Sequence, residues 1–184
     1  MNMDMDVENK LVEIRPLDPA RYAGWQFTAR YVTGSYLDIS PSESGFALTR
    51  RPIAPPAEKS FTDRLFGSWL EAPAAFGAFD GQRLAAIGEG SPESWNNRYR
   101  ISNLCVFEEA DRRRGLGRAL MDRLLAEALR AGARMAVLET QTCNEKAIAF
   151  YRSCRFAVIG FDLYSYSNDD PARQEVRLEM GLKL

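Results

Sequence analysis

The segment RRRGLGRAL, Arg112 to Leu120, places three arginines directly before two glycines and then enters an apolar, helix-like run. The whole chain of 184 residues carries a formal net charge of only −1, so this positive charge is a local feature. Glycines let backbone N–H groups approach a ligand closely, and a helix N-terminus adds about half a positive charge. The segment is therefore a candidate phosphate-binding turn, with a solvated basic turn as the alternative interpretation.

Two common phosphate-binding patterns do not match this segment. A P-loop requires G-x-x-x-x-G-K-[ST], which occurs nowhere in the chain. A dinucleotide loop requires G-x-G-x-x-G, but Leu120 stands where its third glycine belongs. What remains is an R-x-x-G-x-G pattern formed by Arg112, Gly115 and Gly117.

The residues around this turn predict alternating strands and helices. Leu116, Leu120, Leu124 and Ala128 fall on one helical face, and Gly132 is a plausible helix end. Asp80-Gly81 between two apolar runs predicts a tight hairpin over residues 74–90. The other elements expected in this half are strands at 98–107, 134–140, 156–166 and 174–184, and a helix at 144–154.

The first third of the chain is less regular. Its pattern favours a strand at 11–17, a helix within 20–32, a strand at 45–51, a proline-punctuated loop at 51–59, and a helix at 61–72 capped by Ser60 and stopped at Pro73. Taken together, the elements predict an α/β (α+β) fold with a strand–loop–helix–strand crossover in the middle of its sheet. We expect one domain over residues 1–184.

Composition excludes several classes of function. With 46% hydrophobic and 27% charged residues, the chain is typical of a globular protein, and no apolar stretch approaches the ~20 residues of a membrane span. The opening MNMDMDVENK is acidic, unlike a secretory signal, and three cysteines without a CxxC pair favour a reduced cytoplasm. The near-neutral charge argues against nucleic acid as a partner, and no membrane partner is expected.

Histidine is absent from the chain. Serine or cysteine triads that depend on histidine are therefore excluded, and so is the commonest metal ligand. Acid–base chemistry must use carboxylates, tyrosine, cysteine, lysine or ordered water. We expect no metal cofactor.

The strings ISNLCV, RRRGLGRALM and LETQTCNEKAIAFYRSCRF together resemble the GNAT acetyltransferase superfamily. The combination LETQ, N, A, FY, C-x-F followed by GFDLYSY is similar to its streptothricin acetyltransferase branch. The resemblance covers residues 76–184, which would form the acetyl-CoA-binding core. It implies a mixed, mostly antiparallel sheet with a splayed strand pair and flanking helices. Residues 1–75 carry little of the resemblance, and we expect them to hold variable substrate-side helices.

The resemblance implies that the glycine turn binds the pyrophosphate of acetyl-CoA (coenzyme A), used as a co-substrate, through backbone amides. The residues concerned are Arg112, Arg113, Arg114, Gly115, Leu116, Gly117 and Arg118. It also implies that the strand containing Leu104, Cys105 and Val106 parts from residues 135–138. The cofactor arm would then pair with the Cys105 and Val106 backbone as an added strand.

Two residues of the second helix receive roles from the resemblance. Tyr151, the tyrosine of FY, is expected near the cofactor sulfur, where it would protonate the departing thiolate. The alternative is that Tyr151 belongs to the core face of the helix with Ala147, Phe150 and Cys154. Asn144 is expected to cap the helix and to hydrogen-bond the cofactor arm, or to cap alone. Cys143 and Cys154 are expected to be packing residues.

The general base is less evident. Related enzymes often carry glutamate in a pattern like I-E-N-L-x-V, whereas this chain has Ser102 there, which cannot act as a base by itself. Glu139, at the end of its strand, is the favoured base, with a substrate-binding or structural carboxylate as the alternative. Asp162, Glu89 and a water chain remain open as other bases.

Two further departures from the family pattern carry structural expectations. The connection from Val106 to Gly115 is one residue longer than usual, which would shift the arginines. Arg155 replaces a glycine often found after the cysteine, and a left-handed backbone there would cost about 1–2 kcal/mol.

The predicted activity is acetyl-CoA-dependent N-acetylation of a primary amine on a small molecule, with a streptothricin-like antibiotic as the favoured acceptor. Glu139, Asp162 and Glu175 would attract such a cation. Acetylation of a protein, a peptide or a polyamine is an alternative activity. A non-catalytic acyl-CoA-binding module, suggested by Ser102, is another. The sequence leaves both a monomer and a homodimer open.

Overall fold

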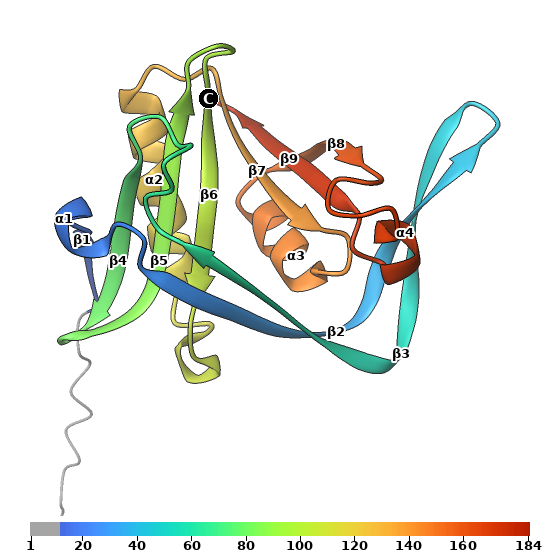
Figure 1. Cartoon of the computed structure of the whole chain (residues 1–184), viewed down its shortest axis with the longest axis horizontal. Coiled ribbons are helices and arrows are strands. Elements are labelled where there is room, and N and C mark those ends of the chain that lie inside the picture. The colour runs from blue at the N-terminus through green and yellow to red at the C-terminus, as the bar shows by residue number, and fades with distance from the viewer. Residues whose placement is uncertain (1–11) are drawn as a thin grey trace, which may run out of the picture.

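The computed structural model describes residues 12–184, so the acidic opening segment and Leu11 lie outside the described residues. Seven strands form one sheet in the order β1-β4-β5-β6-β7-β9-β8 (Figure 1). Their bounds are β1 Glu13–Pro16, β4 Ala74–Asp80, β5 Arg83–Glu93, β6 Arg98–Val106, β7 Met135–Gln141, β8 Ala157–Asp162 and β9 Arg177–Lys183. Within this sheet β6 and β7 are parallel and every other neighbouring pair is antiparallel. The predicted mostly antiparallel α/β fold is confirmed.

The helices are few and mostly short. They are α1 Pro19–Tyr22, the 3-10 turn η1 Glu109–Asp111, α2 Leu116–Arg130, α3 Glu145–Ser153 and α4 Asp170–Arg173. Helix α2 packs on β4, β5 and β6 through its buried apolar side, which includes Leu120, Met121 and Leu124. No helix among residues 12–184 is long and apolar enough to cross a membrane.

Two turns form as the sequence predicts. The β4–β5 hairpin closes next to Gly81, whose φ of 64° is accessible to glycine at little cost. Helix α2 ends at Gly132 with φ 68°, and the Ala133 N–H bonds back to the Ala128 carbonyl at 3.1 Å. This six-to-one hydrogen bond is the Schellman arrangement of a helix end.

Strands β6 and β7 part halfway along their length. They pair only from Arg98 to Ile101 against Met135 to Leu138. Directly afterwards β6 bulges, because Ile101 lies opposite Gly90 on β5 while Asn103 lies opposite Glu89, which leaves Ser102 as the extra residue. A bulge bends its strand and increases its twist. Figure 1 shows the result, with β6 and β7 together near the C-terminus and diverging away from it.

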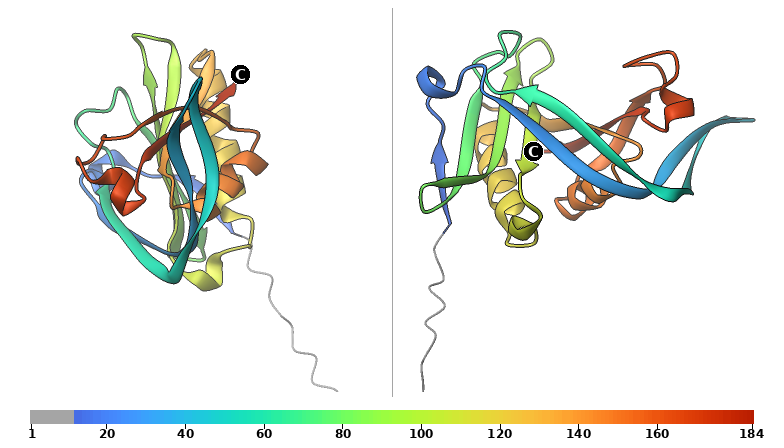
Figure 2. Two further views of the ribbon diagram at one scale, coloured as in Figure 1. Left: turned by 90° about the vertical axis from the view of Figure 1, so that its right-hand side faces the viewer. Right: turned by 60° about the horizontal axis from the view of Figure 1, so that its bottom comes forward.

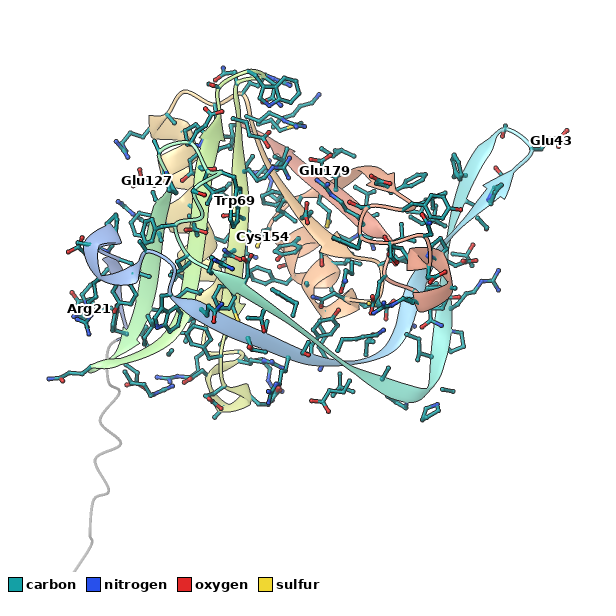
Figure 3. All side chains as sticks on the ribbon, viewed as in Figure 1. Arg21, Glu43, Trp69, Glu127, Cys154 and Glu179 are labelled. Atoms are coloured by element: carbon teal, nitrogen blue, oxygen red, sulfur yellow. The ribbon has the colours of Figure 1, made fainter. Side chains whose placement is uncertain are left out.

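The N-terminal third differs from the prediction. In place of the helices expected within residues 20–32 and 61–72, the chain forms a long antiparallel ribbon of β2, Gln26–Ser42, and β3, Gly45–Arg64. Only α1 remains of the first expected helix. The strand expected at 45–51 is confirmed as part of β3. Glu43 lies at the far tip of the ribbon (Figure 3).

The prolines of β3 explain why the sequence predicts a loop at residues 51–59, which belong to the ribbon. Proline cannot donate to a strand ladder and is tolerated at edges and bulges. Thr33 pairs with Ala57 and Ser35 pairs with Pro52, so residues 53–56, which include two prolines, lie opposite Gly34 alone. Pro55 and Pro56 thus fall where the ladder is interrupted, and pairing resumes on both sides.

The ribbon crosses the open side of the β6–β7 pair (Figures 1 and 2). On the β7 side, the Leu37 N–H donates to the Thr142 carbonyl at 3.1 Å and the Tyr31 hydroxyl donates to Gln141 Oε1 at 3.0 Å. On the β6 side, Arg112 Nη2 donates to the Arg30 carbonyl at 2.8 Å. The ribbon therefore connects the two arms that the sheet leaves apart.

Helix α3 ends in the backbone conformation that Arg155 was expected to adopt at a cost. Arg155 has a φ of 72°, and the Phe156 N–H donates to the Tyr151 carbonyl at 3.0 Å in a second Schellman arrangement. The rings of Tyr151 and Phe156 contact each other with centroids 6.4 Å apart. The strained residue thus belongs to the turn that fixes Tyr151.

Replacing Arg155 with glycine should raise the free energy of unfolding by about 1 kcal/mol, because glycine adopts a left-handed backbone without a Cβ clash. Chemical denaturation followed by circular dichroism measures the change. Arg152→Gly, three residues earlier inside the helix, is the matched control and should lower stability by a similar amount. Equal destabilisation by both variants would contradict this account of Arg155.

Candidate functional site

A cleft of about 250 Å³ lies beside the end of β6, against the ribbon. Three parts of the chain line it: the ribbon, the β6–α2 connection and α3. The lining residues are Arg30, Tyr31, Val32, Glu58, Phe107, Glu109, Arg112 and Lys146. Three cations against two carboxylates leave this lining positive, which suits an anionic ligand.

The glycine turn presents a row of backbone amides without protein acceptors. Within the described chain, no N–H from Arg113 to Arg118 donates to a carbonyl or a side chain, whereas the Arg112 N–H donates to the Glu109 carbonyl at 3.1 Å. Gly115 caps α2 with φ 83° and has no side chain to satisfy the first turn. Such unsatisfied N–H groups at a helix start form an anion-binding site.

The arginine side chains of the turn have different surroundings. Arg114 donates to Asp80 at 3.0 Å and to Asp111 at 2.7 Å, so its charge holds the turn in place. Arg112 pairs with Glu109 and with the ribbon carbonyl of Arg30. Arg113, with φ 64°, makes no side-chain hydrogen bond or ion pair to the described residues and is free to meet a phosphate.

Asp111 holds the glycine turn in place through ion pairs with two arginines. Its carboxylate is almost fully buried and accepts from Arg83 at 2.6 Å and from Arg114 at 2.7 Å. The hydrogen bond from Arg83 is the largest cause that keeps the pKa of Asp111 below its usual value. The ionised carboxylate therefore fixes the side chains of Arg83 and Arg114. Because Asp111 ends η1 directly before the glycine turn, it also fixes the backbone that carries the free N–H groups.

The far half of β6 has an open backbone edge. The Phe107 N–H donates to the Ala85 carbonyl at 3.1 Å, and polar groups of alternate residues in an antiparallel strand face the same neighbour. The backbone of Cys105 therefore faces β5, while that of Leu104 and Val106 faces the opening between β6 and β7. All three were predicted to contact the cofactor, and the geometry favours Leu104 and Val106 as the pairing residues.

Tyr151 lies on α3, half-buried between this edge and the helix end. Burial raises the pKa of its phenol, and the nearby thiols of Cys105 and Cys154 raise it further. Cys105 itself has its pKa raised to about 11 by burial. The phenol and the thiols therefore keep their protons at neutral pH. Tyr151 also packs against the core, so both interpretations of this residue are compatible with its position.

Asn144 caps α3 as the sequence predicts. Its Oδ1 accepts from the Ala147 N–H at 3.3 Å. The Nδ2 group donates to no described residue. That leaves an amide donor at the start of α3, on the β7 side of the cleft. Its contact with the cofactor arm stays a prediction.

Glu139 lies on β7 one residue beyond the last pair with β6. Its carboxylate is partly exposed and pairs with Arg177 at 2.8 Å, while the Tyr166 hydroxyl donates to it at 3.4 Å. On β9 directly opposite, Glu179 bonds to Arg100 at 2.9 Å. Acidic and basic side chains therefore alternate on this face of the sheet, next to the opening between β6 and β7. Figure 3 labels Glu179 on this face. The role of Glu139 as a base stays a prediction.

The other two carboxylates expected to attract a cation lie at the end of β8 and just before β9. Asp162 is on the edge strand β8 and accepts from the Tyr164 N–H at 3.0 Å. Glu175 is paired with Lys59 of the ribbon at 2.7 Å and with Arg173 at 3.2 Å. Both groups already serve the local structure.

Glu89, one of the alternative bases, has surroundings that the sequence did not predict. It lies on β5 beside the bulge of β6 and is fully buried. Its Oε1 accepts from the Phe66 N–H at 2.6 Å, and its Oε2 accepts from Asn103 at 2.9 Å and from Ser102 at 3.2 Å. The Phe66 contact joins residues 23 positions apart, and no local pattern indicates it.

The site fits a diphosphate attached to an extended arm. Free amides and Arg113 suit the phosphates, and the open edge of β6 suits the arm. A Cβ built on Gly117 would meet only Phe150 at 3.5 Å and Val106 at 3.9 Å, so the protein itself leaves room there. Among residues 12–184, no cluster of three or more potential metal-ligating histidine, cysteine or acidic side chains occurs.

This splayed sheet with a glycine turn at a helix start is the architecture of an acyltransferase that uses a coenzyme A thioester. Residues 45–156 match the model of the acetyltransferase (GNAT) family. The chain belongs to the GNAT acetyltransferase family, and it is an N-acetyltransferase. Members of this family use acetyl-CoA as the acetyl donor.

Curated relatives and solved structures resemble most of the chain. A streptothricin acetyltransferase from Escherichia coli is 27% identical over 148 residues, covering 80% of this chain and 82% of the relative. Another from Streptomyces lavendulae is 31% identical over 145 residues, covering 74% and 76%. The crystal structure of a nourseothricin acetyltransferase has a TM-score of 0.74 at 25% identity, covering 94% of this chain and 98% of that one.

An acetyltransferase structure from Bacillus anthracis, determined with acetyl coenzyme A, has a TM-score of 0.75 at 21% identity. The match covers 95% of this chain and 98% of the Bacillus anthracis chain, and the two proteins share the fold. The two structural matches extend over the ribbon as well as the core. The ribbon is therefore part of the architecture that these proteins share.

Replacing Gly117 with alanine should weaken coenzyme A binding about tenfold or more, because the new methyl group would occupy space at the free amides. The fold should remain intact, since the nearest protein atoms lie at ordinary contact distance. Calorimetric titration with coenzyme A measures the affinity. Gly160→Ala on β8, where a Cβ meets nothing within 4 Å, is the control. Equal affinities of both variants and the parent would contradict this placement of the phosphates.

Proposed function

We propose that the protein transfers the acetyl group of acetyl-CoA to a primary amine of a small cationic molecule, with a streptothricin-type antibiotic as the acceptor. The observation that carries this proposal is the similarity to two curated streptothricin acetyltransferases over about three quarters of the chain or more. The acceptor would approach the sheet face that bears Glu139 and Glu179. The cofactor would enter from the side of the glycine turn.

Residues of this chain have distinct parts in the proposed reaction. The free amides of residues 113–118 would hold the diphosphate, and the Leu104 and Val106 backbone would hold the arm. Bound acetyl-CoA supplies a thioester whose carbonyl carbon accepts the amine. The Tyr151 hydroxyl would hold a proton for the departing sulfur, and its raised pKa supports this role because the phenol stays protonated.

Glu139 would act on the acceptor side. Its partial exposure and its position next to the parting of β6 and β7 support a contact with the incoming amine. The ion pair with Arg177 keeps its charge partly compensated. The variant Glu139→Gln therefore distinguishes two roles. If Glu139 is the base, the variant changes the pH dependence of turnover; if Glu139 binds the acceptor, the variant raises the KM of the acceptor.

A direct assay tests the proposed function. The protein is incubated with acetyl-CoA and streptothricin, thiol release is followed, and the product is analysed by mass spectrometry. We expect thiol release that depends on the antibiotic and a product that carries one added acetyl group. If polyamines or peptides are acetylated and streptothricin is not, those molecules are the acceptors. Coenzyme A binding without transfer to any amine would contradict the enzymatic proposal.

Replacing Tyr151 with phenylalanine should lower kcat about 100-fold while leaving the affinity for coenzyme A unchanged, because only the proton donor is lost. Steady-state kinetics and calorimetry measure the two quantities. Tyr22→Phe is the matched control, since the Tyr22 hydroxyl bonds none of the described residues and lies on α1, outside the cleft lining. An unchanged kcat in the Tyr151 variant would remove the residue from the mechanism.

A further inference from the structure

Glu89 is a fully buried carboxylate whose hydrogen-bonding partners are all donors. These are the Phe66 N–H, the Asn103 amide and the Ser102 hydroxyl, at 2.6, 2.9 and 3.2 Å. No arginine or lysine of the described residues forms an ion pair with it. A buried charge without a cation is costly and is usually retained for a reason. Three donors and no acceptor indicate that Glu89 is held in its ionised form.

Burial raises the pKa of Glu89, and its three hydrogen bonds act in the opposite direction. A carboxylate with a raised pKa accepts a proton from an amine more readily than an exposed one. The titratable groups that face it are Asp63, at the end of β3, and Tyr99 on β6. Asp63 raises its pKa further.

Ser102 lies between this carboxylate and the point where β6 and β7 part. It is the extra residue of the β6 bulge and the first residue of β6 beyond the last pair with β7. Its side chain is half-exposed, whereas Glu89 is fully buried. The hydroxyl donates to Glu89 Oε2, so its own lone pairs are free to accept a hydrogen bond from a group that enters the opening between β6 and β7.

We propose that Ser102 and Glu89 form a proton relay that takes the proton from the acceptor amine. This inference rests on the proposed function and identifies a group for the step that the sequence left open. One N–H bond of the acceptor ammonium group breaks and its proton passes to Ser102 Oγ, which leaves the nitrogen a lone pair that then bonds to the acetyl carbon. The original Ser102 O–H bond breaks at the same time, and that proton forms a new O–H bond at Glu89 Oε2. Release of the proton to solvent after product departure restores the pair.

Ser102 is the catalytic residue of this pair, since it touches the nitrogen. Glu89 acts through Ser102 and also has a structural role, because its Oε1 holds the Phe66 N–H where Phe66 has a φ of 55°. Non-glycine residues in the left-handed region need such support. Removing Glu89 therefore affects the end of the ribbon, whereas removing the Ser102 hydroxyl leaves the contacts to Phe66 and Asn103 in place.

The decisive variant is accordingly Ser102→Ala. We expect kcat/KM for the amine to fall about 100-fold near neutral pH, with the affinity for coenzyme A unchanged. The deficit should shrink as the pH approaches about 10.4, where a lysine-like amine loses its own proton. Ser94→Ala, which removes an exposed hydroxyl that bonds no described residue, is the matched control.

Glu89→Gln and the double variant test whether the two groups act as a unit. We expect Glu89→Gln to lose activity to a similar extent, and the double variant to lose no more than either single one. A second readout is independent of activity. In the coenzyme-free protein, Ser102→Ala should raise the pKa of the Glu89 carboxyl, followed by NMR of its side-chain carbon, because the carboxylate loses a donor.

The outcomes separate this inference from the proposed function. Parent protein that acetylates no amine contradicts the proposed function itself. Active parent protein together with an undiminished Ser102→Ala variant overturns the relay alone, and so does an unchanged titration of Glu89. A loss of the acidic limb of the pH profile in Glu139→Gln, with Ser102→Ala unaffected, overturns the relay in favour of Glu139.

Discussion

Strand pairing between β6 and β7 ends at Ile101 and Leu138, and the rest of the site depends on that interruption. A continued ladder would satisfy the backbone of Leu104 and Val106 and would close the cleft. The bulge at Ser102 bends β6 at the same point, so one extra residue both ends the pairing and opens a polar edge. An open strand edge is normally a liability that proteins cover, and here the β2–β3 ribbon and an extended ligand arm would cover it.

The ribbon gives the opening a second boundary. It holds both arms of the parted strands, through Arg30 on one side and through Tyr31 and Leu37 on the other. Its C-terminal end is tied to β5 by the bond from the Phe66 N–H to Glu89. The end of the ribbon is thus attached to the same carboxylate that lies next to the bulge. The glycine turn, the bulge and the ribbon thus lie around the opening between β6 and β7.

Local patterns predicted the C-terminal two thirds well. The Asp80-Gly81 hairpin, the apolar face of α2, the Gly132 helix end and the left-handed Arg155 each depend on neighbouring residues, so short segments carry the information. The ribbon was missed because prolines indicated a loop at residues 51–59 and because helices were predicted within residues 20–32 and 61–72, although QFTARYV alternates as a strand does. The surroundings of Glu89 depend on residues of the ribbon end and of β6, and such tertiary contacts leave no periodic signal. The ion pairs that occupy Glu139 and Glu175 were unpredictable for the same reason.

Amide hydrogen exchange with and without acetyl-CoA tests the central claim most directly, because it reports on individual backbone N–H groups. Bound cofactor should slow exchange at Leu104 and Val106 and at residues 113–118, and should leave the ribbon tip around Glu43 unchanged. Protection confined to other surfaces would contradict the account. One such surface is the groove on the far side of α2, lined by Ile14, Phe76 and Arg123.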